Sequence, residues 1–337
     1  MRSTVIRSDG SICVREEPAR PMLQQSARVR VTRSLISTGT ETDFIRSRRV
    51  HPAGDDFSPG YAAVGEIVQL SPDCPKGRVG QRAACAGWAL ATHSEDIVVP
   101  QNLFASVPDT VDDDNAAFVG CAVTCMHALR QAGVSCGESV AVFGAGLFGQ
   151  ITVRVARAFG ARVLAVAKHP HQADMARSVC QETWTPAELE EALGKIVPAD
   201  LADAVIIAAG GDQEDMIRQA GRLLRDRGTL VILGRGWARV DFREAMFQKE
   251  LTLKNTRAYG PGRYDPVYEE QGIDYPIGYV RWTENRNMYA VLDLMARGRL
   301  DLRPLVTSRW SLQQIPEAYV ALMARGNAQI AALVEYS

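Results

Sequence analysis

Val140-Ala-Val-Phe143 runs directly into Gly144-Ala-Gly146-Leu-Phe-Gly149, and this stretch decides the fold. A short apolar run ends in a G-x-G-x-x-G turn, and apolar residues then recur at three- and four-residue steps as far as Phe159. That spacing predicts a helix with one buried face. Gly160 ends the helix, and residues 162–167 have the apolar composition of a second, parallel strand. Strand, glycine turn, helix and strand within about thirty residues predict a dinucleotide-binding βαβ unit.

Each glycine of the turn has its own physical reason. Gly144 permits the tight turn, Gly146 lets backbone amides approach a pyrophosphate, and Gly149 lets the helix pack closely against the strand. Leu147 and Phe148 begin the helix, whose free N–H groups and positive dipole end then face the phosphates. We therefore expect these residues to bind the cofactor. The alternative is a glycine motif that only packs a helix tightly.

The end of the second strand indicates which dinucleotide is bound. An NAD-preferring unit usually has Asp or Glu there, about 20 residues after the turn, to bind the ribose 2′-hydroxyl. That position is Ala167, and Lys168, His169 and His171 follow closely. No carboxylate repels a 2′-phosphate, and a lysine and imidazoles can attract one. We predict NADP(H), bound by Lys168 and His169; the alternative is a solvated basic turn on an enzyme indifferent to that phosphate.

The composition is that of an ordinary globular enzyme. The chain has 337 residues, which is enough for two domains that each have a hydrophobic core. Of these residues, 46% are hydrophobic and 23% are charged. A net charge of −1 gives no field that favours nucleic acid or an anionic membrane, so we expect neither as a partner. Seven cysteines without a C-x-x-C pair indicate reduced thiols. With no apolar leader after Met1 and no run long enough to span a membrane, we expect a cytoplasmic protein.

Strands dominate the expected structure in the first third of the chain. Apolar and alternating runs predict three of them, at 27–33, 64–70 and 96–100. The acidic stretch 109–115 is expected to cap a helix at 116–132, which leads into the dinucleotide-binding half.

The dinucleotide-binding half continues with parallel strands expected at 203–209 and 228–233, separated by an amphipathic helix at 213–225. After 251–253 the alternation of strand and helix stops, and a loop rich in Gly, Pro, Tyr and Arg occupies 259–282. The remaining elements are two helices and a final strand, at 286–297, 316–325 and 329–334. We predict an α/β chain in which a Rossmann doubly wound parallel sheet is inserted between two pieces of a β-rich domain.

Five motifs occur in the order typical of one superfamily: Gly39-Thr-Glu41, Pro59-Gly-Tyr-Ala-Ala-Val-Gly65, Val98-Val-Pro100, Thr124-x3-Ala128-Leu129 and the glycine turn. Through them, over essentially its whole length, the chain resembles the medium-chain dehydrogenase/reductase superfamily of zinc alcohol dehydrogenases and quinone reductases. The resemblance implies a GroES-like catalytic domain in two parts, 1–116 and 259–337, and a Rossmann NADP-binding domain at 117–258.

Two groups within the superfamily are especially similar to this chain. One is the medium-chain half of two-part oxidoreductases from sugar and natural-product clusters, through Tyr259-Gly-Pro-Gly-Arg-Tyr-Asp265 and Tyr275-Pro-Ile-Gly-Tyr-Val-Arg-Trp-Thr283. The other is the bacteriochlorophyllide hydroxyethyl dehydrogenases, through Ile36-Ser-x-Gly-Thr-Glu41 and Gly60-Tyr-x-x-Val-Gly65. Both groups imply work on a biosynthetic intermediate.

The zinc ligands of the superfamily are missing. Matched residue by residue, the catalytic ligand positions are Thr38, Tyr61 with Ala62, and Gly120. Cys121 lies beside the last of them, but a catalytic zinc needs about three protein ligands. We therefore predict a zinc-free protein.

Two further observations concern metals. The four-cysteine lobe that holds structural zinc in relatives is absent, because residues 82–100 offer only Cys85 and His93. The alternative to a metal-free protein is an unconventional zinc site that uses Cys121 and His127. Otherwise Cys121, Cys125 and His127 are packed or hydrogen-bonded helix residues.

Without a Lewis acid, hydrogen-bond donors or a proton must stabilise a developing oxyanion. The resemblance implies three catalytic candidates. Thr40 matches a proton-relaying hydroxyl of relatives, Tyr61 puts a phenol in place of a zinc ligand, and Glu41 can tune or supply either group. The alternatives are a turn or helix cap at 38–41 and a pocket wall at Tyr61.

Further contacts follow from the resemblance and from the edge of the sheet where ligands bind. Thr124 is expected at the cofactor, as are Ala209, Gly234 and Arg235 at the carboxyl ends of strands. Arg235 can equally be a solvated side chain.

The expected substrate contacts are Thr38, Arg49, Tyr264, Tyr279 and Trp282. Arg49 belongs to a basic run that either binds an anionic handle, such as a phosphate, CoA or carrier arm, or forms a solvated face. The aromatic residues belong to the loop 259–282, which either shapes a pocket or contributes to a small core or a subunit interface. Superfamily habit implies a homodimer.

Three functions remain open. The first is zinc-independent, NADPH-dependent hydride transfer between nicotinamide and a ketone or secondary alcohol of a biosynthetic intermediate, and we favour it. The second is reduction of a conjugated C=C bond or an imine. The third is a catalytically silent nucleotide-binding scaffold, which has no need of proton donors at Thr40, Glu41 and Tyr61.

Overall fold

The computed structural model describes residues 1–336 apart from 53, 181 and 196–200. The chain divides into two compact units. We call Met1–Val123 with Tyr259–Ser337 the split unit, and Thr124–Ala258 the inserted unit. The divisions between the units lie after Val123 and after Ala258.

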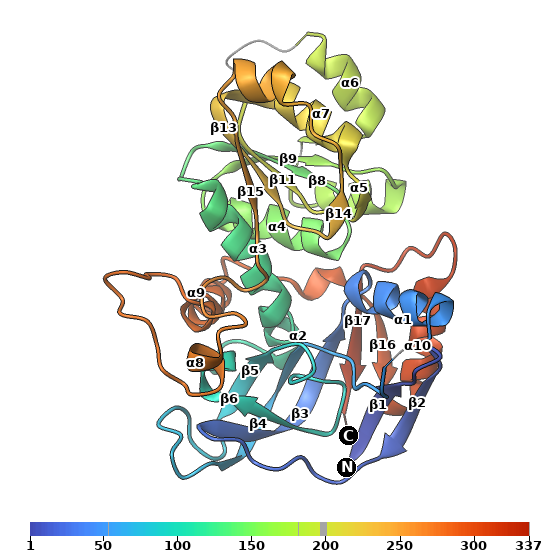
Figure 1. The fold of residues 1–337 in the computed structure, drawn as a ribbon, viewed down its shortest axis with the longest axis vertical. Helices are drawn as coiled ribbons and strands as arrows, with labels where there is room; N and C mark the ends of the chain where they lie inside the picture. The colour runs from blue at the N-terminus through green and yellow to red at the C-terminus, as the bar shows by residue number, and fades with distance from the viewer. Residues whose placement is uncertain (53, 181, 196–200, 337) are drawn as a thin grey trace. The chain divides into compact units, whose positions relative to one another are not determined.

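A six-stranded parallel sheet forms the centre of the inserted unit (Figure 1). Its strands are β8 (Ser139–Phe143), β9 (Arg162–Val166), β10 (Glu182–Trp184), β11 (Ala202–Ile207), β13 (Leu224–Ile232) and β15 (Thr252–Asn255). In space their order is β10-β9-β8-β11-β13-β15, and every neighbouring pair is parallel. The chain starts in the middle, builds one half and then returns to build the other. The predicted Rossmann fold is therefore confirmed, with its switch point between β8 and β11.

Helices connect these strands. They are α4 (Leu147–Ala158), α5 (Pro170–Arg177), α6 (Pro186–Leu193) and α7 (Glu214–Leu223), and α3 (Val119–Ala132) contains the division between the units. A capping box starts α6: the Glu188 N–H donates to Thr185 Oγ1 at 3.2 Å, and the Thr185 N–H donates to Glu188 Oε2 at 2.6 Å. A two-stranded pair, β12 (Gly211–Asp212) and β14 (Gly236–Trp237), and a π-helical turn at Phe242–Met246 complete the unit.

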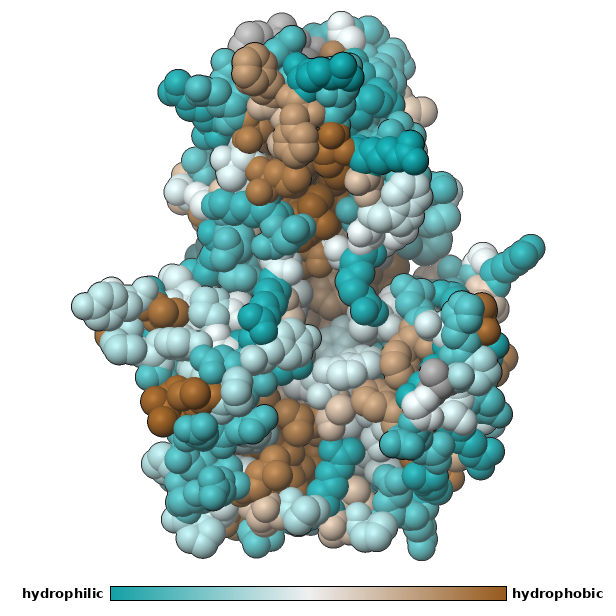
Figure 2. All heavy atoms as spheres, viewed as in Figure 1, coloured by the Kyte–Doolittle hydropathy of each residue, from teal (hydrophilic) through white to brown (hydrophobic). Residues whose placement is uncertain are grey.

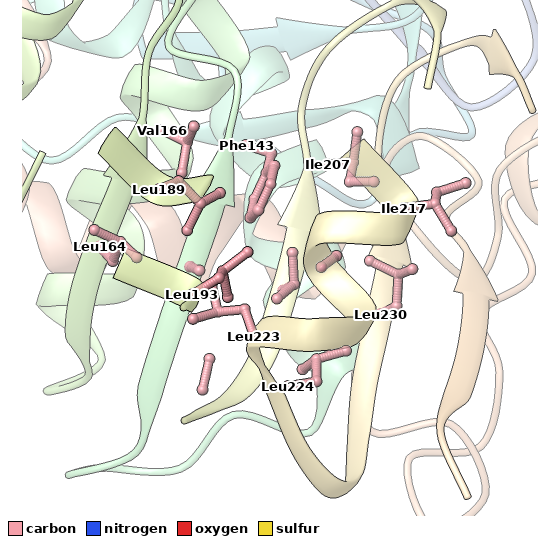
Figure 3. Packing of buried hydrophobic residues seen from close by; sticks show 14 residues of the cluster. Phe143, Leu164, Val166, Leu189, Leu193, Ile207, Ile217, Leu223, Leu224 and Leu230 are labelled. Atoms are coloured by element: carbon pink, nitrogen blue, oxygen red, sulfur yellow. The ribbon is translucent and has the colours of Figure 1, made fainter. Parts of the chain in front are cut away.

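Two of these helices cover one face of the sheet with apolar side chains (Figure 3). Leu189 and Leu193 of α6 and Leu223 of α7 pack against strand residues. The labelled strand residues of this cluster are Phe143, Leu164, Val166, Ile207, Leu224 and Leu230. Burial of this face fixes the strand ends from which the loops of the predicted cofactor site emerge.

The split unit is built on a largely antiparallel sheet of seven strands. They are β3 (Ser26–Ile36), β4 (Ala62–Leu70), β5 (Arg82–Ala86), β6 (Asp96–Pro100), β7 (Phe104–Ser106), β16 (Val306–Ser311) and β17 (Ala331–Glu335). The order is β16-β17-β3-β4-β5-β7, and β6 also pairs with β3. A separate hairpin joins β1 (Arg2–Ile6) to β2 (Ile12–Glu16). This sheet confirms the expected GroES-like fold of the split unit.

The two sequence-distant pieces of the split unit meet where β17 pairs with β3 (Figure 1). The pairing is antiparallel and sets Ala332 opposite Ile36. Two helices, α1 (Thr40–Val50) and α10 (Ile315–Met323), pack on the same core through Ile45 and Tyr319. The other helices of the unit are α2 (Asp113–Ala116), α8 (Pro266–Glu269) and α9 (Glu284–Ala296), with 3-10 turns at 101–103, 303–305 and 312–314.

Some expected elements differ from the structure. The single helix predicted at 116–132 was wrong, because α2 ends at Ala116 and α3 begins at Val119. Asp112, which belongs to the acidic stretch expected to cap a helix, caps α2 by accepting the Asn115 N–H at 2.8 Å. The loop expected at 259–282 contains the short helix α8.

Apolar residues also reach the surface. Figure 2 shows a band of them between hydrophilic flanks on the visible face of the inserted unit. In that unit Trp237, Phe242 and Phe247 are each more than half exposed. Among the described residues, no helix has both the length and the apolar character that crossing a membrane requires.

Candidate functional site

The glycine turn of the inserted unit opens the N-terminus of α4. Gly144 has φ +93°, a backbone conformation that favours glycine. A Cβ on Gly149 would lie 1.8 Å from the Gly144 carbonyl oxygen, so only glycine permits this packing of helix on strand. Gly146 is the N-cap of α4 without a side-chain cap, and a Cβ there would meet no atom within 4 Å. Free N–H groups and open space at one place suit a phosphate group.

Two further predicted residues lie against this turn. A Cβ on Gly144 would lie 2.9 Å from the Ala209 Cβ, and a Cβ on Gly234 would lie 2.7 Å from the Ala209 carbonyl oxygen. Ala209 and Gly234 follow β11 and β13, so the structure brings them together at the switch point. Arg235, the next residue, is exposed. Gln213, which the sequence analysis missed, is buried and donates from Nε2 to the Ala209 carbonyl oxygen at 2.5 Å.

The start of α4 also contacts α3. The Phe148 carbonyl oxygen accepts the Thr152 hydroxyl at 2.7 Å and the Cys125 thiol at 3.4 Å. Leu147 is buried, and Thr124, beside Cys125, is 9% exposed. Thr124 therefore lies one residue from a direct contact with the helix that follows the glycine turn.

The basic residues predicted for a 2′-phosphate follow β9. Ala167 is fully buried in a cluster of small residues with Ala145 and Ala173, while Lys168 and His169 are exposed. Within the ranges that the structure describes, Lys168 makes no ion pair or side-chain hydrogen bond. His169 stacks on the His171 ring at 5.9 Å between centroids. The end of β9 thus offers a lysine and two imidazoles, and no carboxylate between 167 and 171.

Tyr61 is the centre of the predicted catalytic group in the split unit. It is 6% exposed, and its hydroxyl accepts the Cys121 thiol at 3.7 Å. Burial raises the pKa of Tyr61 well above its usual value, and the neighbouring Cys121 raises it further. The phenol therefore stays protonated at neutral pH and is available as a proton donor.

Glu41 lies inside the protein and not on the exposed face of α1. It is 0% exposed, and its carboxylate contacts His93 Nε2 at 2.9 Å and the Ser37 N–H at 2.8 Å. The Tyr319 hydroxyl donates to the same carboxylate. Sequence reasoning missed His93 and Tyr319 as partners, because they lie 52 and 278 residues from Glu41 along the chain.

Two predicted site residues, Thr38 and Thr40, lie at the N-terminus of α1. The helix begins at Thr40, after Gly39, which supplies no side-chain cap. Thr40 is half-buried. The Thr38 hydroxyl donates to the Ile330 carbonyl oxygen at 3.3 Å, and the Thr38 carbonyl oxygen accepts the Thr42 hydroxyl at 2.6 Å.

An aromatic cluster that the sequence analysis did not identify adjoins Tyr61. The Trp88 ring centroid lies 6.1 Å from that of Tyr61, and it stacks on Phe57 at 5.1 Å. Phe44 lies 5.1 Å from Phe57 and 5.7 Å from Trp88. Phe44, Phe57 and Trp88 are all partly exposed, so they form an accessible aromatic wall next to the phenol.

The basic run on α1 makes contacts within its own unit. Arg46 pairs with Asp43 at 3.0 Å, and Arg48 donates to the Asp55 carbonyl oxygen at 2.7 Å and lies over the Phe44 ring. Arg49 is exposed and donates to the Gly10 carbonyl oxygen at 3.4 Å.

The three predicted residues of the loop 259–282 differ in exposure. Tyr264 is 57% exposed and lies under the Arg263 guanidinium at 4.0 Å. Tyr279 is 91% exposed, and Trp282 lies 3.9 Å from the Arg281 guanidinium.

The positions of the superfamily's zinc ligands carry no ligand set. A Cβ on Gly120 would lie 2.9 Å from the Tyr61 carbonyl oxygen, so a cysteine does not fit there without movement. Burial raises the pKa of Cys121 to about 12 and lowers that of His127 to about 4. Over residues 1–336 without the gaps given above, no three His, Cys, Asp or Glu side chains converge.

Comparison with known proteins gives the family. The model of the zinc-binding dehydrogenase family matches residues 148–271. A probable D-xylulose reductase A from Neosartorya fischeri is 31% identical over 281 residues, which are 77% of this chain and 72% of that protein. D-xylulose reductase A from Aspergillus niger is 32% identical over 222 residues, so the match spans 62% of that relative's length.

Solved structures with this fold include galactitol-1-phosphate dehydrogenase from Escherichia coli, with a TM-score of 0.82, 17% identity and 100% coverage of both chains. Another, from Sinorhizobium meliloti 1021, was solved bound to NADP and has a TM-score of 0.80, 20% identity and 99% coverage of both chains. At such identities the likeness concerns the fold alone. Together with the motifs, the sequence matches show that this chain belongs to the medium-chain dehydrogenase/reductase superfamily.

Proposed function

We propose that the protein is a zinc-independent, NADP(H)-dependent oxidoreductase. It transfers hydride between nicotinamide and a ketone or secondary alcohol of a biosynthetic intermediate. The observation that carries the proposal is Tyr61, a buried, protonated phenol that stands where zinc-bearing members have a metal ligand. A phenol in that place can do by proton donation what a metal does by polarisation.

The inserted unit supplies the cofactor residues of the proposal. When bound, a nicotinamide dinucleotide provides or accepts hydride. The N–H groups at Gly146 to Gly149 hold the pyrophosphate, and Ala209, Gly234 and Arg235 line the edge beside them. Thr124 contributes from α3. Lys168 and His169 hold the 2′-phosphate that distinguishes NADP(H) from NAD(H).

The split unit supplies the proton chemistry. Tyr61 donates a proton to the substrate oxygen during reduction and takes it back during oxidation. Glu41 is buried in the same unit, and its carboxyl group acts electrostatically on that phenol. Thr40 orients the substrate oxygen. These roles use side-chain hydroxyls and a carboxylate and no metal.

The substrate contacts remain proposals. Arg49 binds an anionic or carrier-bound group of the substrate, and Thr38, Tyr264, Tyr279 and Trp282 complete the substrate-binding surface. The named relatives are a D-xylulose reductase and a probable D-xylulose reductase, which supports a carbonyl substrate.

The aromatic wall favours a second candidate reaction. Phe44, Phe57 and Trp88 present flat, apolar faces beside Tyr61. Such faces suit a conjugated, planar group better than a polyol chain. Reduction of a conjugated C=C bond or an imine is therefore the alternative, with Tyr61 as the proton donor in either case.

We further propose a cytoplasmic homodimer. The seven cysteines are all free thiols, which supports a reducing compartment. The edge strand β15 offers unpaired backbone groups for sheet-edge association. Sedimentation of the full chain tests the dimer, and a monomer at micromolar concentration contradicts it.

A short set of measurements tests the function. Fluorescence titration compares NADPH with NADH, and NADPH oxidation is then followed with D-xylulose, acetoin and the enone benzylideneacetone. Oxidation with a ketone supports the first reaction, oxidation with the enone alone supports the second, and binding without oxidation supports a nucleotide-binding scaffold. Stoichiometric zinc in the purified protein overturns the zinc-independent mechanism.

A further inference from the structure

A buried amide side chain lies directly behind the glycine turn of the inserted unit. Gln150 follows Gly149 in the sequence, belongs to α4 and is 0% exposed. Its backbone N–H donates to the carbonyl oxygen of Gly146, the N-cap residue of the helix, at 2.8 Å. The buried face of such a helix is usually apolar, and a buried amide costs free energy unless its hydrogen bonds are made. The place of Gln150 therefore calls for an account.

The Gln150 side chain connects two separate segments of the unit. Its Nε2 donates to the Ala145 carbonyl oxygen, inside the glycine turn, at 3.1 Å. It also donates to the Gln172 carbonyl oxygen, in the first turn of α5, at 2.8 Å. Its Oε1 accepts Nη1 of Arg154 at 2.9 Å. Because two acceptors and one donor surround the amide, only this orientation satisfies it, and both of its N–H groups are used.

The turn and the segment after β9 are also in contact through their backbones. The Gly144 N–H donates to the carbonyl oxygen of Val166, the last residue of β9, at 2.9 Å. One small buried side chain from the turn, one from the end of β9 and one from α5 form a cluster, which consists of Ala145, Ala167 and Ala173. Side chains of this size let the three segments approach closely, and Gln150 adds hydrogen bonds that hold them there.

Lys168 and His169 lie between these fixed points. Both are exposed, and His169 is the N-cap residue of α5 without a side-chain cap. The segment that carries them is held at one end by the buried Ala167 and at the other by the hydrogen bond from Gln150 to Gln172. Gln150 therefore sets the position of the two basic residues relative to the free N–H groups of the glycine turn.

The two dinucleotides differ in what they require of this spacing. In NADP(H) the 2′-phosphate and the pyrophosphate are attached to the same ribose, so the ligand sets the separation of the two groups. A site gains fully from both groups only where its two sets of donors stand at that separation before binding. NAD(H) has no 2′-phosphate and uses the pyrophosphate donors alone. A change in the spacing therefore affects the affinity for NADP(H) and not that for NAD(H).

We propose that Gln150 is a positioning residue that makes the inserted unit selective for NADP(H), because it holds Lys168 and His169 at a fixed distance from the glycine turn. The inference rests on the proposed function, in which the turn binds the pyrophosphate and these two residues bind the 2′-phosphate. Gln150 is fully buried, so it acts through these segments and not by contact with the cofactor.

Gln150→Met tests the selectivity, because methionine has a similar length and no donor. We expect the dissociation constant of NADPH to rise about fivefold and that of NADH to stay within about twofold of the wild-type value. The matched control is Thr152→Val, which removes a buried hydroxyl of the same helix that donates to the Phe148 carbonyl oxygen at 2.7 Å, within α4. The control should leave the ratio of the two constants unchanged. A wild-type ratio in Gln150→Met overturns the proposal.

A double-mutant cycle separates positioning from general damage to the helix. In a protein with Lys168→Ala and His169→Ala no basic pair is left to position, so Gln150→Met should then change the NADPH and NADH affinities equally or not at all. The same selective loss of NADPH affinity in both backgrounds overturns the proposal.

Ala173→Val is a second variant, used if Gln150→Met does not fold. The larger side chain moves α5 away from the glycine turn without removing the amide, because Ala173 is 2% exposed in the cluster of small residues. We expect the same selective loss of NADPH affinity. An unchanged ratio in this variant contradicts a role of the spacing.

Hydrogen exchange without cofactor separates this inference from the proposed function. In Gln150→Met the backbone amides of residues 168–173 should exchange several-fold faster than in the wild-type protein, and in Thr152→Val they should not. If the wild-type protein binds NADPH and NADH equally, the proposed cofactor preference fails, while the exchange rates still decide whether Gln150 holds the segment. If NADPH is preferred and Gln150→Met changes neither the ratio nor the exchange, the function stands and the role of Gln150 fails.

Discussion

A Cβ on Gly149 would lie 1.8 Å from the carbonyl oxygen of Gly144. The first turn of α4 and the end of β8 are therefore in direct backbone contact. We expect Gly149→Ala to destabilise the inserted unit by about 1–3 kcal/mol or more, because the helix must move away from the strand. Thermal unfolding measures this loss.

Gly146→Ala is the matched control, since a Cβ at Gly146 meets no atom within 4 Å. We expect an unchanged melting temperature and weaker NADPH binding, because the new methyl group projects into the open N-terminus of α4. If both variants melt alike, the contact between Gly144 and Gly149 does not limit stability.

Lys168→Ala separates the two dinucleotides. The exposed ammonium is expected to bind the 2′-phosphate, and loss of a hydrogen bond to a charged group costs about 1.5–3 kcal/mol. We expect NADPH affinity to fall about tenfold or more while NADH affinity stays constant. Titration by nicotinamide fluorescence measures both. The control is Lys195→Ala, which removes an ammonium group that pairs with Glu191 at 2.8 Å. This variant should change neither the NADPH affinity nor the NADH affinity. Equal loss for NADPH and NADH would contradict a phosphate contact.

Tyr61→Phe removes the proposed donor with a minimal change of shape. The variant keeps the ring next to Trp88 but loses the hydroxyl that accepts the Cys121 thiol. We expect kcat to fall about 10²- to 10⁴-fold with NADPH affinity unchanged. Because burial raises the pKa of Tyr61 well above 10, the wild-type rate should show no tyrosine ionisation between pH 6 and 9. A fully active Tyr61→Phe variant would refute the assignment.

Because His127 is buried, we expect the free energy of unfolding to fall in acid. Burial, with a smaller effect of Arg130, lowers the pKa of His127 to about 4. Its ordinary value near 6.5 applies in the unfolded chain, so below pH 6.5 the unfolded state binds more protons than the folded state. This stabilising contribution is complete above pH 6.5 and is lost as the pH falls toward 4.

Urea unfolding between pH 7 and 4 measures that loss, which for one such group is a few kcal/mol at most. His127→Gln should be less stable at pH 7 and should lose less stability on acidification. His51→Gln is the control, because His51 is exposed. Parallel pH curves for the wild-type protein and His127→Gln would contradict the prediction.

The sequence predicted the parts of the fold whose signals are contiguous. The βαβ unit could be predicted because its strand, glycine turn, helix and second strand follow one another from Val140 to Val166. The helix α1 was missed because its buried positions are Glu41, Thr42 and Ile45, so it has no apolar stripe that a periodicity search can find.

In the candidate site, too, contacts between distant segments could not be predicted from the sequence. Motif matching identified Glu41 and Tyr61, but it could not pair Glu41 with His93 or Tyr319, which sheet pairing and helix packing bring together from distant segments. The aromatic wall was missed for the same reason: Phe44, Phe57 and Trp88 come from three separate parts of the chain. The residues predicted to bind the cofactor lie in short contiguous segments, whereas the surroundings of Tyr61, the proposed proton donor, come from distant segments.

The pairing of β17 with β3 has a consequence for biosynthesis of the protein. Residues 124–258 are continuous, so the inserted unit has all its strands as soon as the ribosome has released them. The sheet of the other unit must wait for residues 331–335 while its first strands are already outside the ribosome. During that interval one side of β3 lacks its neighbour, so its unpaired backbone groups are open to pairing with another nascent chain.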